Sequence, residues 1–176
     1  SELMIKRPKA TAITFNNYSF DSKKDSLFFA SSTISHVTFR NFSEANLNSI
    51  LAMLSSQRSI RSIAIGDSLL TAFRVSLRYF THLDYLQLKN VSLAASVHHP
   101  ERSVLTIDTL SLISDSLVMF SPHFAKQLQI QCLYICNPRR AGFPGGFEGM
   151  SDLKVIGLCG FPATALESMV EQIQAD

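Results

Sequence analysis

The sequence lacks a strong charge of either sign. Its 16 Lys and Arg against 14 Asp and Glu leave a formal net charge of +2 over 176 residues. Chains that bind nucleic acid or an anionic membrane through a basic surface carry a larger positive excess. The composition therefore predicts no nucleic-acid partner. The 46% of hydrophobic and 17% of charged residues also exclude a disordered chain.

Long apolar runs and cysteines are scarce as well. No apolar run approaches the ~20 residues that cross a bilayer, and the first eight residues lack the apolar stretch of a secretory signal. The three cysteines, Cys132, Cys136 and Cys159, are too few and too odd in number for a disulfide framework. We therefore expect free thiols, an intracellular location in an unspecified compartment, and no membrane partner.

Catalytic motifs are missing from the chain. It contains no G-x-S-x-G, no H-E-x-x-H and no paired carboxylates at a telling spacing. The adjacent His98 and His99 have no third ligand near them in the sequence, so a solvated loop is the favoured interpretation. We predict that the protein is not an enzyme and that it holds no cofactor and no metal.

An L-x-x-L-x-L pattern, however, recurs along the chain. Its fourth-position residues are Ile13, Val37, Ile63, Leu86, Leu110, Leu133 and Ile156. Successive members of this row lie 24, 26, 23, 24, 23 and 23 residues apart. Chance clusters of apolar residues do not keep such a period, so the pattern predicts an array of about seven structural repeats.

A second row marks the end of each expected strand. Two positions after the sixth-position residue comes a residue that favours turns: Asn17, Asn41, Asp67, Asn90, Ser114, Asn137 and Gly160. Such residues tolerate unusual backbone angles or form local hydrogen bonds, which suits a tight bend.

The frame resembles the leucine-rich-repeat family, whose consensus is L-x-x-L-x-L-x-x-N/C-x-L. The resemblance runs from Ala10 to the C-terminus, and the segment 83–93 is most similar to the irregular repeats of F-box and other intracellular members. The ninth-position Asn or Cys of the family is absent. The resemblance implies an α/β solenoid, or horseshoe, with a parallel concave sheet. It also implies one domain over 1–176, with a lead-in (1–9), the repeats (10–163) and a C-terminal capping helix (164–176).

The segments between the strands differ from one another. Residues 43–56 carry apolar side chains at helical spacing, with Ser43 as the N-cap. We also expect helices over 68–80 and, from a weaker pattern, over 22–30. Pro100 and Pro122 favour shorter turns in the later crossovers.

The alternation along each strand predicts the surface that meets a partner. Residues at repeat positions 4 and 6 face the core, and those at positions 3, 5 and 7 face outward. The outward residues of the last three repeats carry no charge. This is typical of the cores of protein interfaces. It is also explained if the face is narrow and has no role, or if another segment of a longer native chain covers it. We predict a contact patch of Tyr85, Ile113, Tyr134 and Cys136, with Tyr134 as anchor. Phe143 and Phe147, in a Gly- and Pro-rich loop, are secondary candidates.

These features predict a non-catalytic protein–protein interaction module. The resemblance implies a scaffold or adaptor, such as a substrate-receptor domain. One alternative is a structural subunit that packs through its repeat ends in a larger assembly. A third interpretation is an effector or immune-type recognition protein.

Overall fold

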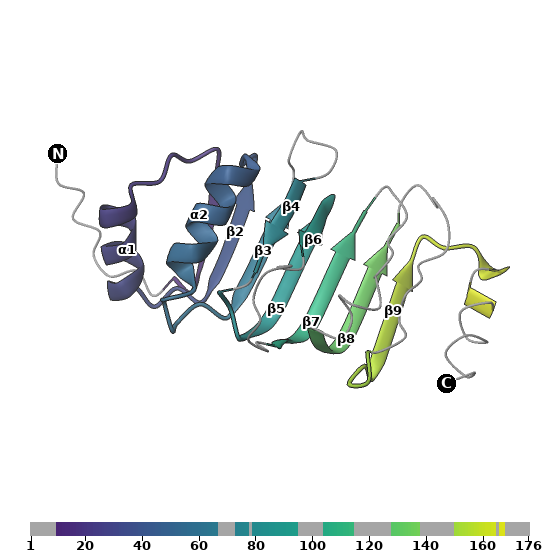
Figure 1. The fold of residues 1–176 in the computed structure, drawn as a ribbon. Helices are drawn as coiled ribbons and strands as arrows, with labels where there is room; N and C mark the ends of the chain where they lie inside the picture. The colour runs from purple at the N-terminus through teal and green to yellow at the C-terminus, as the bar shows by residue number, and fades with distance from the viewer. Residues whose placement is uncertain are drawn as a thin grey trace.

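A seven-stranded, all-parallel sheet forms the main layer of the computed structural model (Figure 1). The structure describes residues 10–66, 73–77, 79–94, 104–114, 128–137, 150–164 and 166–167. Each strand is hydrogen-bonded to the next of the sheet in sequence order, so neighbours in the sheet are neighbours along the chain. The strands are β1 (Ala12–Asn16), β2 (His36–Arg40), β3 (Ser62–Gly66), β5 (His82–Lys89), β7 (Leu105–Ile113), β8 (Leu128–Cys136) and β9 (Val155–Cys159).

The register of the sheet follows the sequence repeat. Ile13 pairs with Val37, which pairs with Ile63, and the same row continues through the remaining strands. The later members of the row are Leu86, Leu110, Leu133 and Ile156. All seven predicted strands and their order are therefore confirmed. The α/β class is confirmed with them.

The predicted core rows are buried along the middle of the sheet. Position 6 is occupied by Phe39, Ile65, Leu88, Leu112 and Ile135, all of which are buried. The prediction of one fully buried row is wrong at its two ends, because Phe15 and Leu158 are only partly buried. These two side chains lie in the outermost strands, where a neighbouring strand covers one side only.

Four of the seven turn residues have the positive φ that a tight bend favours. Asn17, Asn41 and Asn90 have φ values of 46°, 58° and 55°, and Gly160 has a φ of 82°. Asp67 lies outside the described residues, and Ser114 and Asn137 do not have positive φ. Four of the turn residues extend the hydrogen-bond ladder of the sheet by one step, because the backbone N–H of each donates to the carbonyl at repeat position 7 of the next strand. These bonds are Asn17 to Arg40, Asn90 to Ile113, Ser114 to Cys136 and Asn137 to Cys159.

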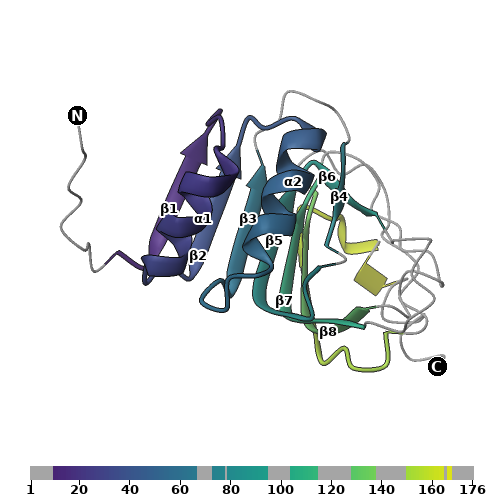
Figure 2. The ribbon, with the colours of Figure 1, turned by 60° about the vertical axis from the view of Figure 1, so that its left-hand side comes forward.

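Two helices cover one face of the sheet near its N-terminal end (Figure 2). Helix α1 spans Ser22–Ser31 and begins at Asp21, whose side chain accepts hydrogen bonds from two backbone N–H groups of the first turn. Helix α2 spans Glu44–Leu54, and the Ser43 hydroxyl accepts a bond from Asn46 N. The predicted helices over 22–30 and 43–56 and the Ser43 cap are confirmed. The buried residues of α2 are Leu47, Ile50, Leu51 and Leu54.

A second, two-stranded sheet lies on the helix side of the large sheet (Figure 2). It consists of β4 (Phe73–Ser76) and β6 (Val91–Ala94), which pair in parallel. The predicted helix over 68–80 is therefore wrong at 73–76. The segment Phe73–Ser76 mixes apolar and polar residues and is too short for its pattern to separate a helix from a strand, and the pairing with β6 decides between them. The cover of the large sheet thus changes from helices to strands along the array.

The central strands are longer than the repeat pattern predicts. In strands β5, β7 and β8 two consecutive side chains are not buried, such as Asp84 and Tyr85 in β5. The ladder skips the pair at repeat position 2 there, and we call this point the bend. At the bend, the carbonyl of Arg61 accepts hydrogen bonds from both Asp84 N (2.9 Å) and Tyr85 N (3.3 Å). The bend adds a second outward row at repeat position 2.

Beyond β9, Ala163, Thr164, Leu166 and Glu167 are helical, and the rest of the predicted capping helix lies outside the described residues. Within the described ranges, no helix combines the length and apolarity needed to cross a bilayer.

Candidate functional site

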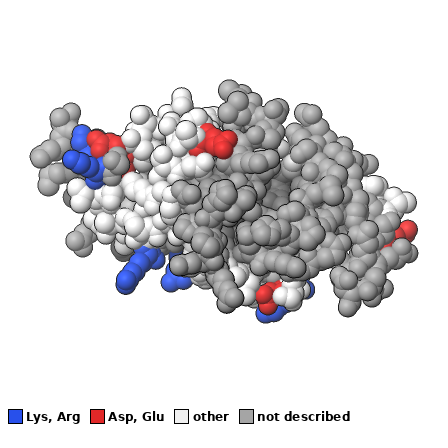
Figure 3. Space-filling model, viewed as in Figure 1, with Lys and Arg blue, Asp and Glu red and all other residues white. Residues whose placement is uncertain are grey.

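The open face is the surface of the seven-stranded sheet opposite α1 and α2, formed by repeat positions 3, 5 and 7. Its described side chains are exposed or partly exposed, with the exception of Ser62. Their accessibility shows that none of the described elements packs over this face. Figure 3 shows the opposite, helix-bearing face. Its described Lys and Arg side chains lie at the left end and along the lower margin, where the strands begin, with Asp and Glu side chains near them.

Ser62 departs from its predicted exposure and is only 7% exposed. Its Cα neighbours in the sheet are His36 on β2 and Tyr85 on β5. A small side chain between two large ones in the same outward row is covered from both sides. The prediction of an accessible Ser62 is therefore wrong.

Three of the four predicted contact residues lie together on the open face. Ile113 on β7 is the register partner of Cys136 on β8, and Tyr134 precedes Cys136 by two residues on the same side of β8. Val155 and Cys159 continue this surface on β9. We call these five residues, which carry no charge, the uncharged strip.

Tyr85 does not join the uncharged strip. It lies on β5, two strands from Tyr134, and its register partner on β7 is Thr109. Phe143 and Phe147 lie outside the described residues, so the secondary prediction stays a prediction.

Tyr134 is the most prominent side chain of the strip. It is 46% exposed, and its ring lies over Gly157 of the adjacent strand. A Cβ placed on Gly157 would be 2.3 Å from Cδ1 and 2.7 Å from Cε1 of Tyr134. Because Gly157 has no side chain, the Tyr134 ring can pack over the backbone of β9 at this position. An aromatic ring held in this way loses little further freedom when a partner binds.

The thiols of Cys136 and Cys159 lie side by side as register partners on β8 and β9. A hydrogen bond with Cys159 and, to a smaller extent, burial raise the pKa of the Cys136 thiol above its ordinary value. All three cysteines are free thiols. A raised pKa keeps Cys136 protonated at neutral pH, so it adds to the strip as a neutral, weakly polar group rather than as a nucleophile.

A polar row runs across the strands at repeat position 2, beside the bend. From the β3 side of the sheet to the β9 side, the residues at this position are Arg61, Asp84, Asp108, Gln131 and Lys154. The row is linked by contacts from strand to strand. These are Arg61–Asp84 at 3.6 Å, Gln131 Nε2 to Asp108 Oδ1 at 3.3 Å, and Lys154 Nζ to Gln131 Oε1 at 3.3 Å.

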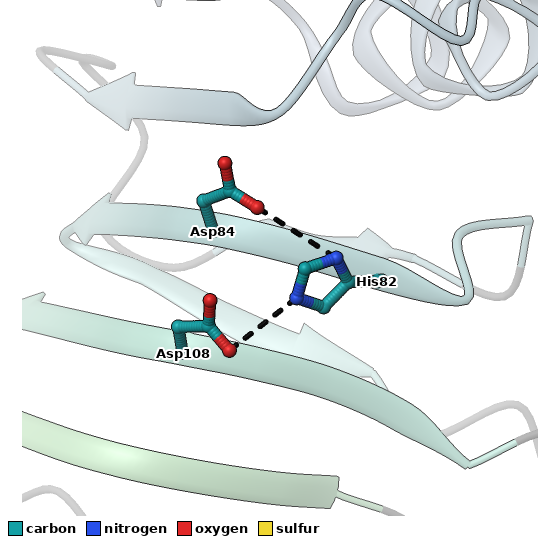
Figure 4. A group of neighbouring side chains, drawn as sticks. All are labelled: His82, Asp84 and Asp108. Carbon is teal, nitrogen blue, oxygen red and sulfur yellow. Dashed lines mark hydrogen bonds and ion pairs between the residues drawn. The ribbon is translucent and has the colours of Figure 1, made fainter.

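His82 lies between the two carboxylates of this row (Figure 4). Its Nδ1 is 3.7 Å from Asp84 Oδ1, and its Nε2 is 3.3 Å from Asp108 Oδ1. Asp84 and Asp108 belong to different repeats, so no short spacing along the sequence indicates this group. The signal that finds it is the repeat itself, because residues at the same repeat position in adjacent strands become neighbours in space.

One hollow on the helix side is also present. It has a volume of about 150 Å³ and is lined by residues of the first crossover and of α2, among them Phe20, Asn46 and Met53. Pockets for drug-sized ligands measure about 300–1,000 Å³, so this hollow is small.

No protein-family model, no curated protein and no solved structure matches the chain.

Proposed function

We propose that the chain is a leucine-rich-repeat solenoid that binds a protein partner, without catalysis, on its open face. Its repeat period, the matching strand register and the positive-φ Asn turns support the repeat assignment. The resemblance to irregular intracellular repeats favours an adaptor or substrate-receptor role in this interaction.

The observation that carries the proposal is the uncharged strip with Tyr134 at its centre. Cores of protein interfaces are depleted of charge and enriched in Tyr. Tyr134 offers a large apolar ring with a polar tip, and the Gly157 contact orients that ring before a partner arrives. The matching partner surface presents apolar side chains around a hydrogen-bonding group that meets the Tyr134 hydroxyl.

A binding experiment with two matched variants tests the proposal. The partner is captured from native lysate, identified by mass spectrometry, purified, and titrated against the wild-type chain, Tyr134→Ala and Thr14→Ala. Thr14 is also exposed on the open face, but it lies on β1, far from the strip. We expect Tyr134→Ala to weaken binding by more than about 1 kcal/mol and Thr14→Ala to leave it unchanged.

The opposite result would place the binding site elsewhere. If Tyr134→Ala binds like the wild type while Phe143→Ala abolishes binding, the loop around residue 143 is the site and the open face is not. Both variants must retain the circular dichroism spectrum of the wild type for this comparison.

A further inference from the structure

We propose that His82, Asp84 and Asp108 form a binding site for one divalent transition-metal ion, of the Zn²⁺ class, at the edge of the open face. Each residue offers one ligand atom, and these three atoms all lie within 4.8 Å of one another. The site is independent of the uncharged strip and of the proposed partner.

The sheet fixes the three ligands from two adjacent strands. His82 and Asp84 leave the same strand, β5, two residues apart, and Asp108 lies beside them on β7. The pairs Leu83–Ile107 and Tyr85–Thr109 hold the two strands in register on either side of the two aspartates. Because the backbone is held by this ladder, only side-chain rotations separate the present arrangement from a ligand set.

The distances suit a tetrahedral ion. Metal–ligand bonds of about 2.0–2.1 Å in a tetrahedron separate the ligand atoms by about 3.3–3.4 Å. His82 Nε2 and Asp108 Oδ1 are already 3.3 Å apart. Asp84 Oδ1 lies 3.7 Å from the other ring nitrogen, Nδ1, so a side-chain rotation of the half-exposed Asp84 must bring its carboxylate to the Nε2 side, and the three ligand atoms start within 4.8 Å of one another. Water would take the fourth position, because the site faces solvent.

The donor types select the class of ion. One imidazole nitrogen with two carboxylate oxygens is a mixed N/O set that suits Zn²⁺ and its first-row neighbours, whereas Ca²⁺ and Mg²⁺ favour oxygen ligands alone. Two adjacent carboxylates also draw a cation to this edge.

The surrounding side chains orient Asp108, whereas Arg61 must leave Asp84 before that carboxylate can bind an ion. Gln131 donates to Asp108 Oδ1 and is itself contacted by Lys154, which orients the Asp108 carboxylate. Hydrogen bonds of this kind to metal ligands raise metal affinity. Arg61 pairs with Asp84 at 3.6 Å, but its side chain is 57% exposed. A surface pair of this kind contributes little, so the ion can displace Arg61 from Asp84.

Zinc titration of the full chain tests the site. Zn²⁺ alone is titrated in competition with a chromophoric chelator, and Co²⁺ is used to read ligand type from its visible absorption. The variants are His82→Ala and Asp108→Asn, with His36→Ala as a matched control. His36 is also an exposed histidine on the open face, but its Nδ1 contacts Ser35 rather than a carboxylate. Cys159→Ser is included because paired thiols also bind zinc.

We expect the wild type, His36→Ala and Cys159→Ser to share one saturable zinc site without a thiolate-to-cobalt band. His82→Ala and Asp108→Asn should lose at least about 100-fold in affinity for it, since even outer hydrogen-bond partners of metal ligands account for about 10–100-fold. Circular dichroism without metal checks that both variants fold. The proposal is overturned if the wild type binds no zinc, if His82→Ala binds it as tightly as the wild type, or if only Cys159→Ser loses binding.

Discussion

Gly157 and Gly160 lie close together at the C-terminal end of the sheet, yet the structure requires them for different reasons. At Gly157 a Cβ would meet the ring of Tyr134, which is a side chain that can swing aside. At Gly160 a Cβ would lie 2.4 Å from the backbone carbonyl oxygen of Asn137, which cannot move without disturbing β8. Gly160 also has a φ of 82°, a conformation that strains any residue with a side chain.

This difference predicts different effects of the same substitution. Gly160→Ala should lower the free energy of unfolding by about 1–3 kcal/mol from the backbone conformation alone. Gly157→Ala should change stability little, because it displaces only the Tyr134 ring. Urea denaturation of the two variants measures both effects. Equal midpoints for the two variants would show that the turn after β9 is not built as described.

The sequence could have located Gly160 but not the role of Gly157. The turn row predicts Gly160 because it falls at the same repeat position as Asn17, Asn41 and Asn90. The repeat places Tyr134 and Gly157 side by side, because both occupy position 5 in adjacent repeats. The sequence does not indicate that the Tyr134 ring turns towards Gly157.

At the level of elements, the repeat period is enough to predict the seven strands of the large sheet. Apolar residues at positions 4 and 6 must share one face of a strand, and a stack of such strands has one way to bury them together. Helix α2 is equally predictable, since Leu47, Ile50, Leu51 and Leu54 form one stripe after a capping serine.

Two elements were beyond prediction from local patterns. The pair β4–β6 depends on backbone pairing between segments in different repeats, and the short segment Phe73–Ser76 fits a helix as well. The extension of β5, β7 and β8 beyond the bend was missed because the pattern begins at position 1, whereas Leu105 and Leu128 add a further buried residue before it. Of the group of His82, Asp84 and Asp108, His82 lies in this extension and the two aspartates lie at the bend.

The central strands provide the test of the predicted register. Leu88 is fully buried at position 6 of β5, with Ile65 and Leu112 as its register partners. Leu88→Ala should cost about 2–5 kcal/mol in the free energy of unfolding, because it removes buried atoms and leaves a cavity. Leu27→Ala on the exposed side of α1 is the control, and we expect it to stay within about 0.5 kcal/mol of the wild type. A cost below about 1 kcal/mol for Leu88→Ala in chemical denaturation contradicts the register.

At the scale of the whole molecule, the two faces of the sheet differ in how far their side chains are buried. The helix-bearing face buries the apolar rows, and α1, α2 and the small sheet lie over its N-terminal and central part (Figure 2). The open face leaves its side chains accessible, with the uncharged strip towards β9 and the polar row along the edge where the strands bend. Which residues form the open face was predictable from the alternation of residues along each strand. The separation of Tyr85 from Tyr134 follows from the same predicted order of strands, because β7 lies between β5 and β8.

The central claim is that the open face, and not the helix side, binds the partner. Three tyrosines form a natural set of probes, because Tyr134, Tyr18 and Tyr79 have nearly equal exposures of 46%, 43% and 44%. Tyr134 lies on the open face, Tyr18 contacts Asp25 of α1, and Tyr79 lies in the connection before β5. All three are therefore accessible to a tyrosine-labelling reagent in the free chain. Burial and the Asp25 carboxylate raise the pKa of Tyr18, so each tyrosine is compared with its own rate in the free chain.

The most direct measurement is labelling of these tyrosines in the purified complex, read by mass spectrometry residue by residue. The account predicts that the partner protects Tyr134 strongly, while Tyr18 and Tyr79 react as in the free chain. Unchanged labelling of Tyr134 together with protection of Tyr18 or Tyr79 would contradict it.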